Sequence, residues 1–220
     1  MSEEPEVLKK EIVDQLYWDP KVDASKIEVR VDGRKVLLEG EVPHHSAKQA
    51  ASDDCWLIKG VKFVDNRLEV EHPPALKVTQ DTEIKSDILE AFDLNALIDK
   101  ENVEVSVVNG IVTIKGEVDT YWKKEQAEAI ISEIKGVKKI YNELNTVPSG
   151  KYTDQEIQKE IKSAIKRNKQ VNAEKVKIQV KNGEVTLSGI VRNWRALNAA
   201  RDAARYTSGV IDLNNKLEVE

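Results

Sequence analysis

Few residues in this chain have types suited to catalysis or metal binding, and their spacing assembles no recognisable site. The histidines are His44, His45 and His72, and the one cysteine is Cys55. A structural metal site needs about four His, Cys or carboxylate ligands, whereas Cys55 falls on the apolar stripe of a helical segment. No serine has a recognisable base partner, and the glycines lack phosphate-loop spacing. A carboxylate pair among the 39 acidic residues stays open, although solvated faces explain them more simply. We therefore predict no enzyme activity, no metal and no cofactor.

The composition is that of an ordinary globular protein. Of the 220 residues, 40% are hydrophobic and 33% are charged, and a single cysteine excludes an internal disulfide framework. No apolar stretch approaches the roughly 18 residues of a membrane-spanning helix. The start of the chain, Met1 to Glu6, lacks the basic and apolar regions of a secretory signal. The expectation from the sequence as written is a cytoplasmic protein, or a periplasmic one if an export signal has been removed.

The elements that would have to position any site recur three times. Glycine-valine pairs begin at Gly60, Gly136 and Gly209, and each follows another glycine by 20 residues. Apolar residues spaced by four precede them and indicate a helix with one buried stripe. These residues are Leu8, Ile12 and Leu16; Ile84, Ile88 and Phe92; and Ile157, Ile161 and Ile165.

After each predicted first helix, alternating apolar residues indicate two strands joined by a tight turn. Asn109-Gly110 and Asn182-Gly183 are strong hairpin signals, since both central residues must adopt positive φ. The first copy has Asp32-Gly33-Arg34 instead, so its turn type can differ. A second helical stripe and a last strand complete each copy.

The pattern predicts an α+β fold of three tandem αββαβ modules, because two helices on one face of a three-stranded sheet bury every stripe. We place the modules at residues 1–72, 78–148 and 152–220, with linkers at His72-Pro73-Pro74 and Pro148-Ser149-Gly150. The strand order is left open.

This pattern resembles the BON domain family. The motifs that carry the resemblance are Gly-x-Val at the end of the second strand, Gly-Val after the second helix and Asn-x-Leu in the last strand. They occur as Gly40-Glu41-Val42, Gly60-Val61 and Asn66-Arg67-Leu68; Gly116-Glu117-Val118, Gly136-Val137 and Asn142-Glu143-Leu144; and Gly189-Ile190-Val191, Gly209-Val210 and Asn215-Lys216-Leu217.

The resemblance implies a bacterial envelope or osmotic-stress protein that binds anionic phospholipid or a protein partner. The motif residues themselves are glycines and apolar residues that make the fold, so they transfer no site. The function hypothesis is therefore a non-enzymatic BON-repeat binding protein. The alternative is a cytoplasmic assembly, adaptor or ion-sensing module with no membrane contact.

The charge distribution singles out the third module. Residues 1–74 carry 11 basic and 16 acidic side chains, residues 75–148 carry 9 and 14, and residues 149–220 carry 14 and 9. Such asymmetry suggests a partner. Two explanations stay open: the basic face binds anions, or it is solvated or docks against the acidic modules.

The predicted anion-binding set comprises Arg192, Trp194, Arg195, Arg201 and Arg205, which fall in or beside the second helix of the third module. Its first helix also ends in a basic run, Lys166 to Lys169. Basic residues and an interfacial tryptophan together favour anionic lipid. Nucleic acid is the weaker rival, because phosphate would repel two acidic modules and the basic module lacks a recognition motif.

Two tryptophans occupy positions where the other modules carry smaller or charged residues. Trp18 corresponds to Leu94 and Arg167, and Trp56 corresponds to Ser132 and Arg205. The module core does not need an aromatic ring there, so we predict that Trp18 and Trp56 contact a neighbouring module, a second chain or a ligand. An inter-module contact is preferred, with both tryptophans partly buried between modules or between chains.

Overall fold

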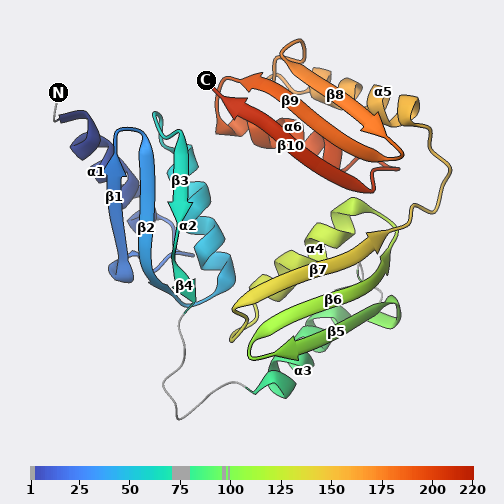
Figure 1. The fold of residues 1–220 in the computed structure, drawn as a ribbon, viewed down its shortest axis with the longest axis horizontal. Coiled ribbons are helices and arrows are strands. Elements are labelled where there is room, and N and C mark those ends of the chain that lie inside the picture. The colour runs from blue at the N-terminus through green and yellow to red at the C-terminus, as the bar shows by residue number, and fades with distance from the viewer. Residues whose placement is uncertain (1–2, 71–79, 96–97, 99) are drawn as a thin grey trace. The chain divides into compact units, whose positions relative to one another are not determined.

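The structure is a computed structural model, and it describes residues 3–70, 80–95, 98 and 100–220. Its helices and strands fall into three groups with one common order, which we call the first, second and third modules (Figure 1). The predicted linker at residues 72–74 lies outside the described residues. The linker at residues 148–150 contains neither helix nor strand. The boundaries predicted for the modules, 1–72, 78–148 and 152–220, stay a prediction.

The first module contains a sheet in which β2 is central. β1 pairs with β2 in antiparallel register, from Ile27 opposite Gly40 to Asp32 opposite Lys35, and β3 and β4 both run parallel to β2. The predicted last strand is therefore formed in two pieces. The elements are α1 (Glu3–Trp18), a short 3-10 turn (Ala24–Lys26), β1 (Ile27–Asp32), β2 (Lys35–Val42), α2 (His45–Leu57), β3 (Phe63–Asn66) and β4 (Glu69–Val70).

The other two modules repeat this order with an unbroken last strand. The second has α3 (Asp81–Asp93), a 3-10 turn (Lys100–Asn102), β5 (Val103–Val108), β6 (Ile111–Val118), α4 (Tyr121–Ser132) and β7 (Lys139–Thr146), with strand order β5-β6-β7. The third has α5 (Asp154–Arg167), β8 (Val176–Lys181), β9 (Glu184–Val191), α6 (Trp194–Arg205) and β10 (Asp212–Val219), with order β10-β9-β8. In the third module β8 is antiparallel and β10 parallel to β9.

The predicted helical stripes form the module cores. Ile12 and Ile161 are fully buried, as are Val36 and Leu187 from the strands that the helices cover. In the first and third modules these residues belong to one apolar cluster each, built from both helices and one face of the sheet. The predicted fold class, three α+β modules of a three-stranded sheet with helices, is confirmed.

The hairpin turns have the geometry that their sequences predict. Asn109 and Asn182 have φ of 53° and 52°, and the glycines that follow them also have positive φ, as a type I′ turn requires. In the first module only Gly33 of the two loop residues has positive φ, so this turn is of another type. An acidic residue at the start of the first helix holds the type I′ turns. In the third module Asp154 accepts hydrogen bonds of 2.9 Å from the backbone N–H of Asn182 and of Gly183.

The glycine of the Gly-x-Val motif lies where no side chain fits. A Cβ at Gly40 would lie 2.0 Å from the carbonyl oxygen of Lys26, and the same approach recurs at Gly116 and Gly189. The φ of Gly40 is also +127°, which L side chains rarely adopt. The motif therefore requires glycine because the backbone of the second strand approaches the carbonyl group just before the first strand.

The asparagine of the Asn-x-Leu motif ties the last strand to the second helix. Asn66 Nδ2 donates to the carbonyl oxygen of Lys48 at 2.7 Å, and Asn142 Nδ2 does the same to Lys124 at 2.8 Å. The Oδ1 atom of Asn66 accepts from the backbone N–H of Leu68 at 3.1 Å. One amide side chain thus satisfies backbone groups in two elements.

Replacing Gly40 by alanine should destabilise the first module by at least about 2 kcal/mol, since both steric overlap and unfavourable φ must be relieved. Hydrogen exchange of peptides from this module measures the loss of stability in this module alone. Gly33→Ala is the matched control, because a Cβ at Gly33 meets no atom within 4 Å, so only the cost of positive φ applies. Equal exchange rates in the two variants would contradict the steric argument.

A buried carboxyl group lies between the two helices of the first module. Asp54 is 4% exposed, and its Oδ1 accepts a hydrogen bond from Gln15 Nε2 at 2.9 Å. Its Oδ2 atom has no hydrogen-bond partner. Burial raises the pKa of Asp54, the Gln15 hydrogen bond opposes this, and the nearby charges of Asp19 and Asp53 raise the pKa further.

A carboxyl whose folded-state pKa lies above its unfolded value loses stabilising effect as the pH rises through the folded pKa. Asp54→Asn should therefore unfold at a higher temperature than wild type at neutral pH, and the difference should vanish below the usual titration range of aspartate. Thermal unfolding across that pH range measures this. Asp14→Asn, at an exposed position of α1, is the control. An Asp54→Asn variant less stable than wild type at neutral pH would show that the ionised carboxylate is favourable where it lies.

Candidate functional site

Helix α6 carries four of the five residues of the predicted anion-binding set. The helix begins after Asn193, whose side chain accepts a hydrogen bond from the backbone N–H of Ala196 at 2.9 Å, a typical N-cap. Its buried face is made mostly of alanine and packs on the sheet. The remaining positions therefore decide what α6 presents to solvent.

The predicted set divides at the start of α6. Arg192, in the connection from β9, and Arg195, in the first turn, are both exposed. Trp194 lies between them and is partly buried against the core of its own module. The two arginines can therefore contact an anion. Trp194, by contrast, packs against the module core and is less accessible.

Arg201 and Arg205 lie on a different face of α6 and are half-buried. The Arg205 side chain is 18% exposed, with Nε 3.2 Å from Glu125 Oε2 and Nη1 3.6 Å from Asp202 Oδ1. Glu125 belongs to the same compact unit of the chain as Arg205. The Arg205 guanidinium also stacks 4.7 Å from the centroid of the Tyr206 ring. Arg201 Nε is buried and makes no hydrogen bond. The five residues therefore do not form one face.

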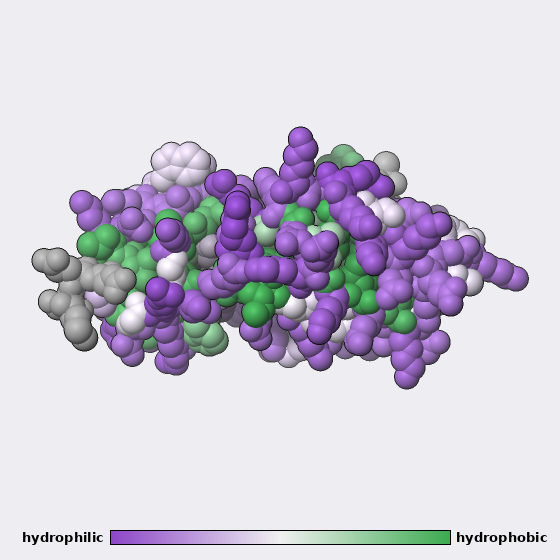
Figure 2. Space-filling view, turned by 90° about the horizontal axis from the view of Figure 1, so that it is seen from above, coloured by the Kyte–Doolittle hydropathy of each residue, from purple (hydrophilic) through white to green (hydrophobic). Residues whose placement is uncertain are grey.

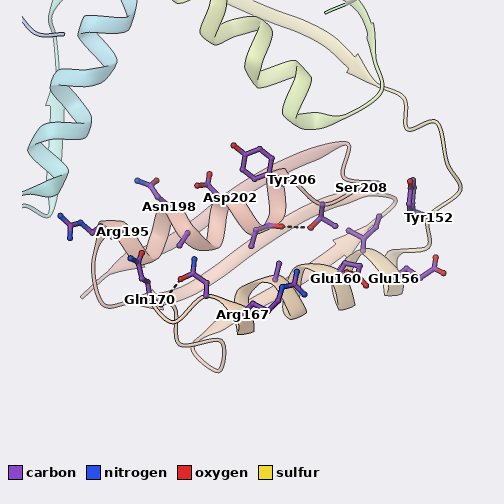
Figure 3. A pocket seen from close by; sticks show the side chains of 16 residues that line it. Tyr152, Glu156, Glu160, Arg167, Gln170, Arg195, Asn198, Asp202, Tyr206 and Ser208 are labelled. Atoms are coloured by element: carbon purple, nitrogen blue, oxygen red, sulfur yellow. Dashed lines mark hydrogen bonds between the residues drawn. The ribbon is translucent and has the colours of Figure 1, made fainter. Parts of the chain in front are cut away.

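A groove of about 900 Å³ runs between α5 and α6 in the third module. Arg195 lines it together with Arg167, the last residue of α5; in Figure 3 Arg195 lies at one end and Arg167 lies between Arg195 and Glu160. Glu156 and Glu160 lie toward the other end of the same view. The sequence-based set omitted Arg167, although the signal for it was the basic run at the end of the first helix. Arg167, Arg192 and Arg195 are all exposed, and Arg167 and Arg195 line the groove.

The two singled-out tryptophans have different surroundings. Trp18 is 78% exposed at the end of α1, beside Tyr17, which is 66% exposed. Trp56 is partly buried and packs against the core of the first module. Hydrophilic residues cover most of the face shown in Figure 2, with apolar residues between them. A contact of Trp18 and Trp56 with a neighbouring module or partner stays a prediction.

The residues considered for metal binding or catalysis are not brought together. Cys55 is buried, and burial raises the pKa of its thiol to about 12, so it stays protonated at neutral pH. Burial lowers the pKa of His45, with a contribution from Lys48. His72 lies outside the part of the chain that the structure describes. Among the placed residues, no group of three or more His, Cys, Asp or Glu side chains could hold a metal ion.

No helix in the described ranges is long and apolar enough to cross a bilayer.

Three proteins show detectable sequence similarity. Osmotically-inducible protein Y of Escherichia coli strain K12 is 27% identical over 128 residues, which cover 57% of this chain and 64% of that protein. A 21 kDa hemolysin of Actinobacillus pleuropneumoniae is 32% identical, covering 59% of this chain and 71% of the hemolysin. Outer membrane lipoprotein DolP of Haemophilus influenzae is 34% identical, covering 60% and 73% respectively. The chain thus spans less than two thirds of the length of the first of these relatives.

Solved structures that align along nearly the whole chain include a domain of low sequence identity. The C-terminal domain of CdsD, a structural protein of the type III secretion system of Chlamydia trachomatis, is covered to 96% at 14% identity with a TM-score of 0.27. A TM-score this low carries no conclusion about function.

The model of the BON domain matches three separate stretches, residues 6–72, 80–148 and 153–220. Each stretch contains one αββαβ module with its glycine and asparagine motifs in place. The chain therefore belongs to the BON domain family.

Proposed function

We propose that this protein is a non-enzymatic binding protein of the bacterial envelope, and that its third module binds anionic phospholipid surfaces. The observation that carries the proposal is the exposure of Arg192 and Arg195 at the start of α6, in the module with a surplus of basic residues. The corresponding positions are Pro43 and Ser46 in the first module and Asp119 and Trp122 in the second. Neither of those modules repeats this pair of arginines.

The position of the arginines strengthens their attraction for phosphate. The first turn of a helix has unsatisfied N–H groups and the positive end of the helix dipole. Cations placed there oppose the dipole, which is unfavourable for the helix, but the two positive potentials add for an approaching anion. Arg167, which lines the same groove as Arg195, adds a further exposed positive charge to this module.

The relatives support an envelope and stress-related role. One is described as osmotically inducible and another as an outer membrane lipoprotein. We propose the same compartment for this chain, in place of the cytoplasm. Arg201 and Arg205 contribute less in this proposal, because the Arg205 guanidinium already has acidic neighbours at Glu125 and Asp202.

A second function is favoured by a different observation. Tyr17 and Trp18 expose large aromatic surfaces at the end of α1, and exposed aromatics are typical of contacts with a protein partner. In that case the chain acts as an adaptor or assembly module without membrane contact.

Replacing Arg192 and Arg195 by glutamate in the full chain should weaken binding to phosphatidylglycerol-containing vesicles by at least about tenfold. Each basic residue near an anionic surface contributes roughly 1 kcal/mol, and the affinity should fall with salt because exposed charges are screened. Vesicle co-sedimentation measures both effects. Reversal of Arg201 and Arg205 should have a smaller effect.

The matched control is Lys85→Glu with Lys135→Glu, which changes the net charge equally at exposed positions of the second module. If the control and test variants lose vesicle binding equally, the effect is due to net charge and not to the position of Arg192 and Arg195. Wild-type protein that ignores the vesicles at low salt would refute the lipid proposal and favour the adaptor.

A further inference from the structure

The groove of the third module exists because small side chains replace a bridge between the helices. Ala164 of α5 and Ala203 of α6 both line it. The corresponding residues in the first module are Gln15 and Asp54, which join α1 to α2 by a 2.9 Å hydrogen bond. Two alanines cannot make such a bridge. The groove floor is consequently low and apolar, which allows another helix to approach closely.

The walls of the groove carry opposite charges at a regular spacing. On α5, Glu160 and Arg167 both face the groove, and seven residues separate them, which is about two helical turns or roughly 10 Å. On α6, Arg195 and Asp202 have the same spacing and also line it. Figure 3 shows the arginine of each pair displaced toward the same end of the groove relative to its acid.

The face is therefore dipolar along the groove, with alanine between the charges. In a two-fold contact, residue i meets residue j of the second copy and j meets i. Rotating a copy by half a turn about an axis through the level of Ala164 reverses its charge direction. Glu160 of each copy then faces Arg167 of the other, so this pair of charges on α5 is complementary to itself.

We propose that the α5–α6 face of the third module pairs with the same face of a second copy of this chain. The four helices would pack over the alanine floor, with two Glu160–Arg167 contacts related by symmetry. Tyr152 and Tyr206, which are 45% and 59% exposed at the groove, would be covered, and tyrosine and arginine are enriched in such interfaces. A purely anionic surface would match only the arginine end, and a basic helix only the acidic end.

This pairing is separable from the proposed lipid binding. Arg195 lines the groove, but Arg192 does not. Glu160 takes no part in the proposed lipid binding, whereas Arg167 contributes a charge to it. Glu160→Arg therefore tests the pairing without removing a lipid-binding charge, and self-association of every variant is measured in solution without lipid.

The test is the mass of the full chain in sedimentation equilibrium at low ionic strength, against 24.8 kDa for one copy. Wild type should reversibly reach twice that mass. Glu160→Arg and Arg167→Glu should each weaken self-association by at least about tenfold, because like charges then meet twice per dimer. Glu90→Arg, an equal charge change at an exposed position of α3, should leave it unchanged.

A mixture of the two single variants gives the sharpest comparison. The Glu160→Arg chain offers two arginines where the Arg167→Glu chain offers two acids, so the mixture should form a heterodimer that neither variant forms alone. The double variant carrying both changes should self-associate again. A mixture that keeps the mass of one copy, or single variants that associate as wild type does, would overturn the proposal. Circular dichroism of each variant verifies folding, and self-association of the double variant still tests the pairing if one single variant fails to fold.

Discussion

The close approach of two backbone segments at Gly40, Gly116 and Gly189 constrains everything else in the modules. At each of these positions a carbonyl oxygen of the residue before the first strand occupies the space of a Cβ, within 2.0 to 2.1 Å. The glycine pairs with the first residue of that strand, as Gly40 does with Ile27. The register of the hairpin is thereby fixed, and register decides which side chains face the helices.

The remaining recurrent contacts hold helices to this hairpin. Asp154 binds the amide groups of the turn at one end of the hairpin in the third module, and Asn66 and Asn142 join the last strand to the second helix. None of these contacts depends on residues at the outer helix surfaces. The residues on those surfaces can therefore differ between modules. At equivalent positions, the first module has the exposed Trp18 and the third has Arg167.

The fold could be predicted from the sequence because its determinants are local and occur three times. The periods of two and four, the Asn-Gly turns and the glycine spacing each point to the same elements. The strand order could not be predicted, because both parallel and antiparallel neighbours satisfy the same alternating pattern. The break of the last strand after Asn66 in the first module was also missed, since its motif is shared with unbroken strands.

The candidate site was predicted only in part, because exposure depends on contacts between distant residues. Helical spacing placed Arg201 and Arg205 on one face, but it could not reveal that Glu125 and Asp202 lie beside the Arg205 guanidinium. Nor could it show that Arg167 and Arg195 line one groove, since they belong to different helices. The buried Asp54, where the third module has alanine, was invisible for the same reason.

The three modules share one fold, and we propose that only the third presents an anion-binding surface. Titration of the isotope-labelled full chain with micelles of a short-chain anionic phospholipid, followed residue by residue in amide NMR spectra, tests it most directly. We expect shifts concentrated at Lys166 to Lys169 and Arg192 to Arg195, with the equivalent turns of the first two modules unchanged. Shifts centred on the first or second module, or spread evenly over all three, would contradict this claim.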